Sequence, residues 1–63
     1  MPTTSELRAM QKSELFRILK LKVINAKRGL EIAEIDNMIT ELKAPMEAED
    51  VAYVEKLIAD FTP

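Results

Sequence analysis

The stretch that most constrains the fold is Leu15-Phe16-Arg17-Ile18-Leu19-Lys20-Leu21-Lys22-Val23-Ile24. Seven of its ten residues are apolar and the other three are basic. On a helix, at about 100° per residue, the apolar side chains do not gather on one side. They form two stripes: Leu15, Phe16, Leu19 and Val23 on one side, and Ile18, Leu21 and Ile24 on the other. A helix that is apolar on more than one face is usually buried on more than one face.

The second stripe extends toward the N-terminus through Leu7 and Met10. We expect the first stripe to join the core of the chain itself and the second to meet a partner. The candidate residues for this dimer or partner stripe are Met10, Ile18, Leu21 and Ile24.

The small size of the chain gives a second reason to expect a partner. Its 63 residues make one domain, residues 1–63, near the lower limit for a chain that folds alone. It contains no cysteine and no histidine, so it has neither a disulfide nor a thiolate or imidazole metal site. Oligomerisation is the remaining way to stabilise a small domain, and we therefore expect a homodimer.

The first helix is expected over residues 4–28. Thr3-Thr4-Ser5-Glu6 fits a capping box, with Thr3 as the N-cap and Glu6 at the third helical position. Lys27-Arg28-Gly29 is typical of a helix end, because the cations suit the negative end of the helix dipole. Gly29, the only glycine, can take the left-handed conformation that follows many helices.

Two shorter helices are expected to follow, over about residues 32–43 and 46–61. Ala44-Pro45 separates them, because proline suits the first helical position and biases the residue before it away from helix. Glu47, Glu49 and Asp50 place negative charge at the start of the last helix, where its dipole favours it. The expected buried faces are Ile32, Ile35, Met38, Ile39 and Leu42 in one helix, and Val51, Val54, Leu57, Ile58 and Phe61 in the other.

These elements predict an all-α, three-helix protein: a long N-terminal helix followed by a helical hairpin. The two short helices have one apolar stripe each and can cover one side of the long helix. Its other side then remains for a second subunit, which predicts a dimeric helical bundle.

A competing interpretation makes residues 17–23 a β-strand, because apolar and polar side chains alternate there. A strand followed by two helices resembles the plan of the ribbon–helix–helix repressors. That resemblance covers architecture only, and it implies a two-stranded ribbon in the major groove with Lys20 and Lys22 facing the DNA. Against it, no turn residue follows Val23, and Gly29 would fall inside the next helix.

An enzyme is not expected from these residue types. The chain has no histidine, cysteine or tryptophan and no glycine-rich phosphate loop. Its acidic residues do not follow the spacing of a calcium loop, so we expect no metal and no cofactor.

Charge is distributed unevenly along the chain. Residues 1–28 carry seven basic and two acidic side chains, for a net charge of +5, whereas residues 29–63 carry two basic and nine acidic ones, for −7. A basic ridge on the first helix could contact phosphates. The candidate anion-contacting residues are Arg17, Lys20, Lys22, Lys27 and Arg28. The total charge of −2 and the absence of interleaved aromatic residues argue against nucleic acid as the main partner.

The expected function is that of a small, non-enzymatic regulatory or adaptor protein that acts through protein–protein interaction as a homodimer. The alternative is a small nucleic-acid-binding transcriptional regulator that uses Lys20 and Lys22, or the ridge of Arg17, Lys20 and Lys27. The chain shows no signal-peptide pattern and no apolar run of membrane-spanning length, so we expect a cytoplasmic protein without a membrane partner.

Overall fold

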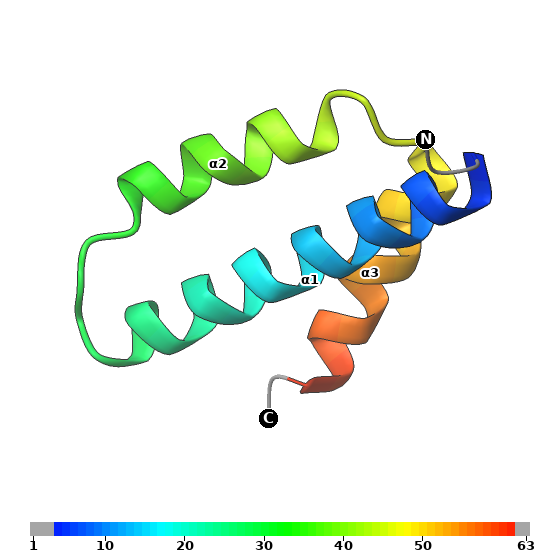
Figure 1. Ribbon diagram of the computed structural model, residues 1–63. Helices are drawn as coiled ribbons and strands as arrows, with labels where there is room; N and C mark the ends of the chain where they lie inside the picture. The colour runs from blue at the N-terminus through cyan, green and yellow to red at the C-terminus, as the bar shows by residue number, and fades with distance from the viewer. Residues whose placement is uncertain (1–3, 62–63) are drawn as a thin grey trace.

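The structure, a computed structural model, describes residues 4–61, which form three helices and no strand. Helix α1 spans Thr4–Lys27, α2 spans Ala33–Lys43 and α3 spans Ala48–Phe61 (Figure 1). The predicted all-α, three-helix architecture is confirmed, and each helix end lies within two residues of the predicted one. The predicted N-cap, Thr3, lies outside the described residues.

The strand interpretation of residues 17–23 is wrong, because this segment lies inside α1. Alternation over a few apolar residues fits a strand and a two-faced helix equally well. The structure decides between the two, because one helix continues unbroken from Thr4 to Lys27.

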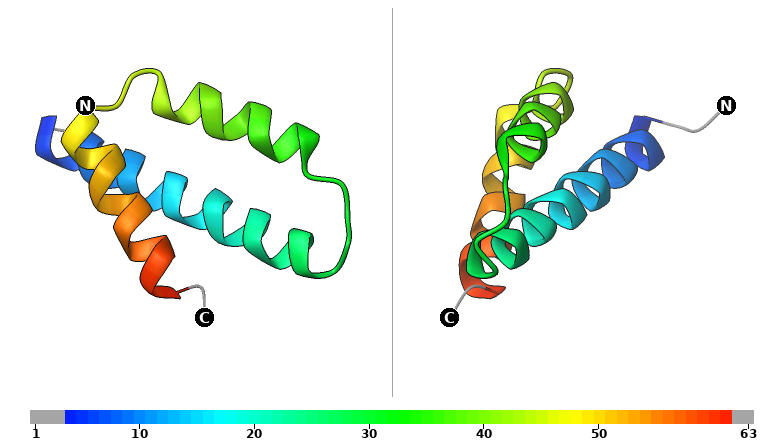
Figure 2. Two further views of the ribbon diagram at one scale, coloured as in Figure 1. Left: turned by 180° about the vertical axis from the view of Figure 1, so that it is seen from behind. Right: turned by 90° about the vertical axis from the view of Figure 1, so that its left-hand side faces the viewer.

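Helix α1 is the centre of the fold. Helix α2 returns alongside it, and α3 crosses its N-terminal half from behind (Figures 1 and 2). Both short helices make their main contacts with α1. The two short helices were predicted to cover one side of α1 together. Instead they pack against different parts of its surface, so more of the circumference of α1 is buried (Figures 1 and 2).

The core is formed by Leu15 and Ile18 of α1, Ile35 and Ile39 of α2, and Val54 of α3. Ile18 is a correction to the predicted partner stripe, since it is only 6% exposed. It follows Leu15 by three residues, and residues three apart lie on the same side of a helix. Because Leu15 is fully buried in the core, at 0% exposure, Ile18 is buried next to it. Partly buried side chains surround this centre: Phe16, Leu19, Ile32, Leu42 and Met46.

The predicted buried face of α3 is only partly buried. Val54 is fully buried and Val51 and Ile58 are half-buried, but Leu57 and Phe61 are exposed. Helix α3 crosses α1 instead of running along it (Figure 2), so Leu57 and Phe61 keep much of their surface in water even though the Phe61 ring contacts Phe16 of α1. No helix among residues 4–61 is both long enough and apolar enough to cross a bilayer.

The end of α1 forms the glycine-dependent turn that the sequence predicts. The amide of Leu30 donates to the carbonyl of Asn25 at 2.9 Å, and that of Gly29 donates to Ala26 at 3.2 Å. This pair of bonds is the Schellman motif, which needs a left-handed residue just after the helix. Gly29 supplies it, with φ of 71°.

Gly29→Ala is therefore expected to lower the free energy of unfolding by roughly 1–2 kcal/mol, the cost of a left-handed L-residue. A Cβ at this position would meet no atom within 4 Å, so the penalty comes from the backbone and not from a clash. Urea unfolding measures it. Gly29→Asn is the control, because asparagine tolerates this conformation and should cost less. Equal costs for the two variants would contradict this explanation.

The turn between α2 and α3 differs from the predicted one. Ala44 keeps helical angles, φ −54° and ψ −46°, and its amide donates to the carbonyl of Thr40. Pro45 lies in the turn and is not the first residue of α3, which begins at Ala48. A residue that precedes proline usually avoids helical angles. Ala44 adopts them nonetheless, and it gains the hydrogen bond to Thr40 in doing so.

Candidate interaction surface

One side of α1 leaves large apolar side chains exposed. They are Leu7 at 46%, Met10 at 61%, Leu21 at 42% and Ile24 at 36%. Glu14 and Arg17 lie between the two apolar pairs on the same side of the helix. We call these residues the α1 stripe: Leu7, Met10, Glu14, Arg17, Leu21 and Ile24.

The predicted partner stripe is thus only partly reproduced. Met10, Leu21 and Ile24 are exposed together on α1, whereas Ile18 is in the core. Leu7 belongs with the exposed residues, as its position on the helix suggests. Sequence reasoning missed the spacing of the complete stripe, which alternates steps of three and four residues from 7 to 24. This spacing is the heptad pattern of helices that pair along a seam.

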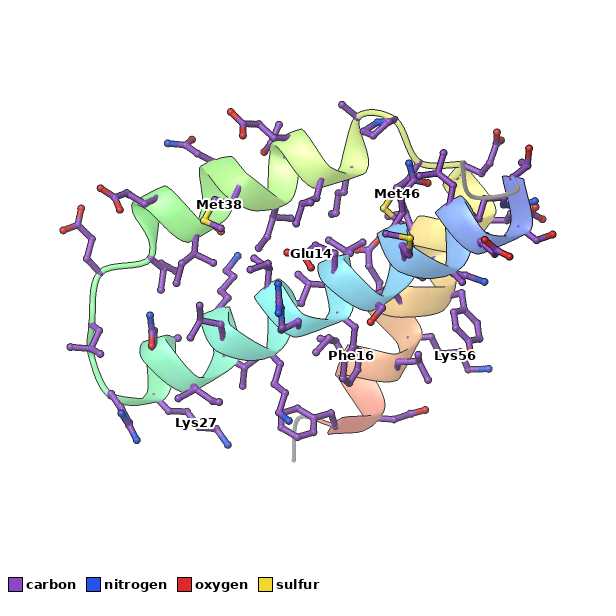
Figure 3. All side chains as sticks on the ribbon, in the orientation of Figure 1. Glu14, Phe16, Lys27, Met38, Met46 and Lys56 are labelled. Atoms are coloured by element: carbon purple, nitrogen blue, oxygen red, sulfur yellow. The ribbon has the colours of Figure 1, made fainter. Side chains whose placement is uncertain are left out.

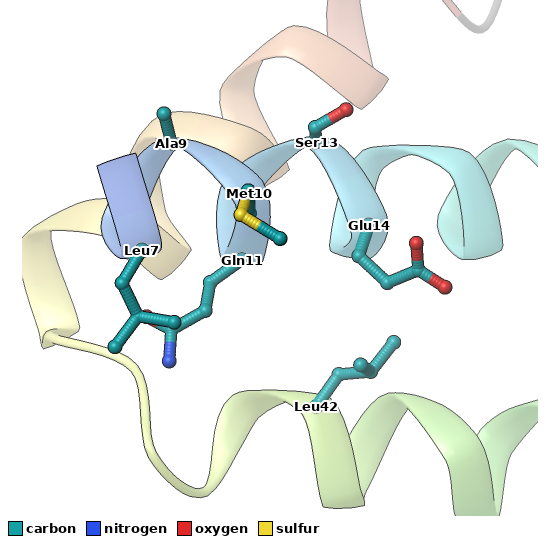
Figure 4. A pocket seen from close by; sticks show the side chains of 7 residues that line it. All are labelled: Leu7, Ala9, Met10, Gln11, Ser13, Glu14 and Leu42. Carbon is teal, nitrogen blue, oxygen red and sulfur yellow. The ribbon is translucent and has the colours of Figure 1, made fainter. Parts of the chain in front are cut away.

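Two hollows lie along the α1 stripe. The larger, of about 570 Å³, is lined by Leu7, Met10 and Glu14 from α1 and by Leu42 from α2, among others. Figure 4 shows the side chains of Leu7 and Glu14 on the α2 side of the helix, with Leu42 opposite them. The second, of about 390 Å³, is lined by Arg17, Ile18, Lys20, Leu21 and Ile24. Both hollows are shallow and open to solvent, and they lie beside the apolar residues of the stripe.

The middle of the stripe is ionic. Arg17 donates from Nη2 to both carboxylate oxygens of Glu14, at 2.7 Å each. Both side chains are well exposed, Arg17 more than Glu14. An exposed pair of this kind contributes little to the stability of a single chain. The pair interrupts an otherwise apolar surface at one defined place, between Met10 and Leu21.

The predicted anion-contacting residues are not brought together as one site. Lys22 pairs with Asp36 of α2 at 2.6 Å, and Arg17 pairs with Glu14. The ammonium of Lys20 lies over the ring of Phe61, 5.3 Å from its centre. Lys27 and Arg28 lie exposed at the end of α1 (Lys27 is labelled in Figure 3).

A partly buried ion pair between α1 and α3 was not predicted. Arg8 donates to both oxygens of Asp50, at 2.8 and 2.9 Å, and also to Glu49 at 2.8 Å. Asp50 is only 5% exposed, whereas the sequence predicted for it only a charge that complements the dipole at the start of the last helix. The hydrogen bond from Arg8 holds the pKa of Asp50 below its ordinary value. This pair fastens the first turn of α3 to the N-terminal half of α1.

Stability is expected to fall in acid through Asp50. Because its folded-state pKa lies below the unfolded value of about 3.8, its contribution is present above that pH and is lost as the pH falls through the folded-state pKa. Urea unfolding from about pH 5 to pH 2 measures this loss. Asp50→Asn should flatten the dependence. Glu49→Gln is the control, because that side chain is 77% exposed and well screened, and it should keep most of the dependence.

Comparison with protein-family models, curated proteins and solved structures finds no match to this chain. Its function is therefore inferred from the α1 stripe, the hollows along it and the charges at its centre.

Proposed function

We propose that this chain is a small, non-enzymatic regulatory or adaptor protein that acts by binding protein, and that it forms a homodimer through the α1 stripe. The observation that carries the proposal is the exposure of Leu7, Met10, Leu21 and Ile24 on one side of the central helix. Exposed apolar residues are common singly, but a run of them along one helix is typical of an interaction surface.

The energetics of a small domain support the same proposal. Only five apolar side chains are buried among residues 4–61. Burying further apolar surface stabilises a protein by about 25 cal/mol per Å². A partner on the α1 stripe would cover four large side chains that the fold leaves in water, and so add to the small core.

Light scattering tests this proposal. The expected result is the mass of a dimer at micromolar concentration, with a fraction of monomer that grows on dilution. The mass of one chain over the whole concentration range, in a sample that is helical by circular dichroism, would overturn it.

The nucleic-acid alternative has weaker support in the same surface. Three of its five cations already contact other groups: Arg17 contacts Glu14, Lys20 contacts Phe61, and Lys22 contacts Asp36. A mobility-shift titration at two salt concentrations separates the alternatives. We expect no shift; binding that weakens steeply with salt would favour the regulator that binds nucleic acid.

A further inference from the structure

The α1 stripe has a symmetric pattern. Reading from either end, an apolar pair comes first, then the ionic pair, then another apolar pair. Leu7 and Met10 are as far from the midpoint, between Leu15 and Phe16, as Ile24 and Leu21 are on the other side. Glu14 and Arg17 flank the same midpoint with opposite charges.

We propose that the α1 stripe pairs with the same stripe of a second copy in antiparallel orientation, about a two-fold axis at this midpoint. The inference rests on the proposed function, because it gives the partner and the geometry of the dimer. In this register Leu7 lies against Ile24 of the second copy, and Met10 lies against Leu21. Antiparallel helices pair in this way, residue i with j and j with i, as a two-fold interface requires.

Charge complementarity selects the antiparallel orientation. At the two-fold axis, Glu14 of each copy faces Arg17 of the other, so the centre of the seam holds two opposite-charge pairs. A parallel pair in register would instead place Glu14 against Glu14 and Arg17 against Arg17. Like charges at the centre of an interface are unfavourable, whereas a polar layer with complementary partners sets orientation and register.

The charged residues beside the two ends of the α1 stripe also favour the antiparallel orientation. Glu6 lies one position before Leu7 and Lys27 lies three after Ile24, on the same side of the stripe. In the antiparallel register the two are neighbours across the seam, at both ends, with opposite charges. A slip of one heptad would bring the ionic residues of one copy against apolar residues of the other, which costs desolvation without a partner charge.

Helix α2 would complete the interface on one side. It lies alongside α1 at the edge of the stripe, where Leu42 lines the larger hollow (Figure 4). A two-fold axis perpendicular to the α1 pair carries α2 of the second copy to the same side of that pair. The two α1 and two α2 helices then form an antiparallel four-helix arrangement, a stable way to pack amphipathic helices.

Single cysteines test the orientation, because the chain has no cysteine of its own. Chains carrying Met10→Cys are mixed with tagged chains carrying Leu21→Cys, allowed to exchange and then oxidised. The expected product is a mixed disulfide of one tagged and one untagged chain. Two cysteines at position 10 would be about 16 Å apart along the axis, too far for a disulfide. Ala59→Cys, on the exposed surface of α3, is the control and should form no specific disulfide.

The outcomes separate this inference from the proposed function. Dimers of the expected mass that form only like-with-like disulfides would show a parallel seam and overturn the inference while leaving the dimer. A sample that stays monomeric overturns both. If either variant loses helicity by circular dichroism, Leu7→Cys mixed with Ile24→Cys makes the same test at the outer layer of the stripe.

Discussion

Leu15→Ala is expected to lower the free energy of unfolding by about 2–5 kcal/mol, the range for removing a large apolar side chain from a core. Leu15 is fully buried, on the central helix that both α2 and α3 contact. The cavity left behind would touch the core of the whole fold, so collapse around it is difficult. In a small domain this is a large share of the total stability.

Urea unfolding, followed by circular dichroism at one fixed protein concentration, measures this loss. The concentration is held constant because the apparent stability of a dimer depends on it. Leu30→Ala is the matched control: Leu30 lies exposed in the turn after α1, and its loss should cost no more than about 0.5 kcal/mol. Equal costs for the two variants would show that Leu15 is not at the centre of the core.

Leu21→Asp is expected to weaken the dimer by about 100-fold or more while leaving the fold intact. Each dimer contains two copies of Leu21, so the variant loses the burial of two partly exposed leucines and places two carboxylates without partners at an apolar interface, which together should cost about 3 kcal/mol or more. A loss of about 3 kcal/mol corresponds to roughly a hundredfold change in the dissociation constant. The single chain tolerates the change because Leu21 is 42% exposed.

Sedimentation measures the dissociation constant, and circular dichroism measures the helix content of the same sample. Leu57→Asp is the matched control, since it makes the same chemical change on α3 at a similar exposure of 38%. It should leave the dimer unchanged. If Leu57→Asp dissociates the dimer and Leu21→Asp does not, the interface lies on α3 and the proposed surface is wrong.

The ion pair between Arg8 and Asp50 bears on how well α1 can act as an interaction helix. It anchors the N-terminal half of α1 to the start of α3, on a part of α1 away from the stripe. A helix held in this way loses less conformational entropy when it binds than a free one does. The stripe is thus presented on a preformed surface, which favours pairing of folded chains.

Local signals in the sequence were sufficient for the helices. The single glycine ends α1, because only a residue that tolerates positive φ fits the Schellman turn there. The break near Pro45 was also predictable, although the first residue of α3 was not. Element ends depend on a few hydrogen bonds of similar energy, such as that from Ala44 to Thr40, and these are decided by the surrounding structure.

The division of apolar residues between core and surface was less predictable. Helical spacing groups Ile18 with Leu21 as readily as with Leu15, so the sequence leaves its side undetermined. The positions of α2 and α3 around α1 decide it. The same holds for Asp50, whose partner Arg8 lies 42 residues away in the chain.

By itself, the sequence determined that this protein is three helices with more apolar surface on the first than one chain buries. It did so because helix formation and helix ends depend on neighbouring residues. The tertiary structure decided which apolar residues stay exposed and that Asp50 is buried against Arg8. Those properties depend on contacts between residues far apart in the chain, which local spacing does not specify.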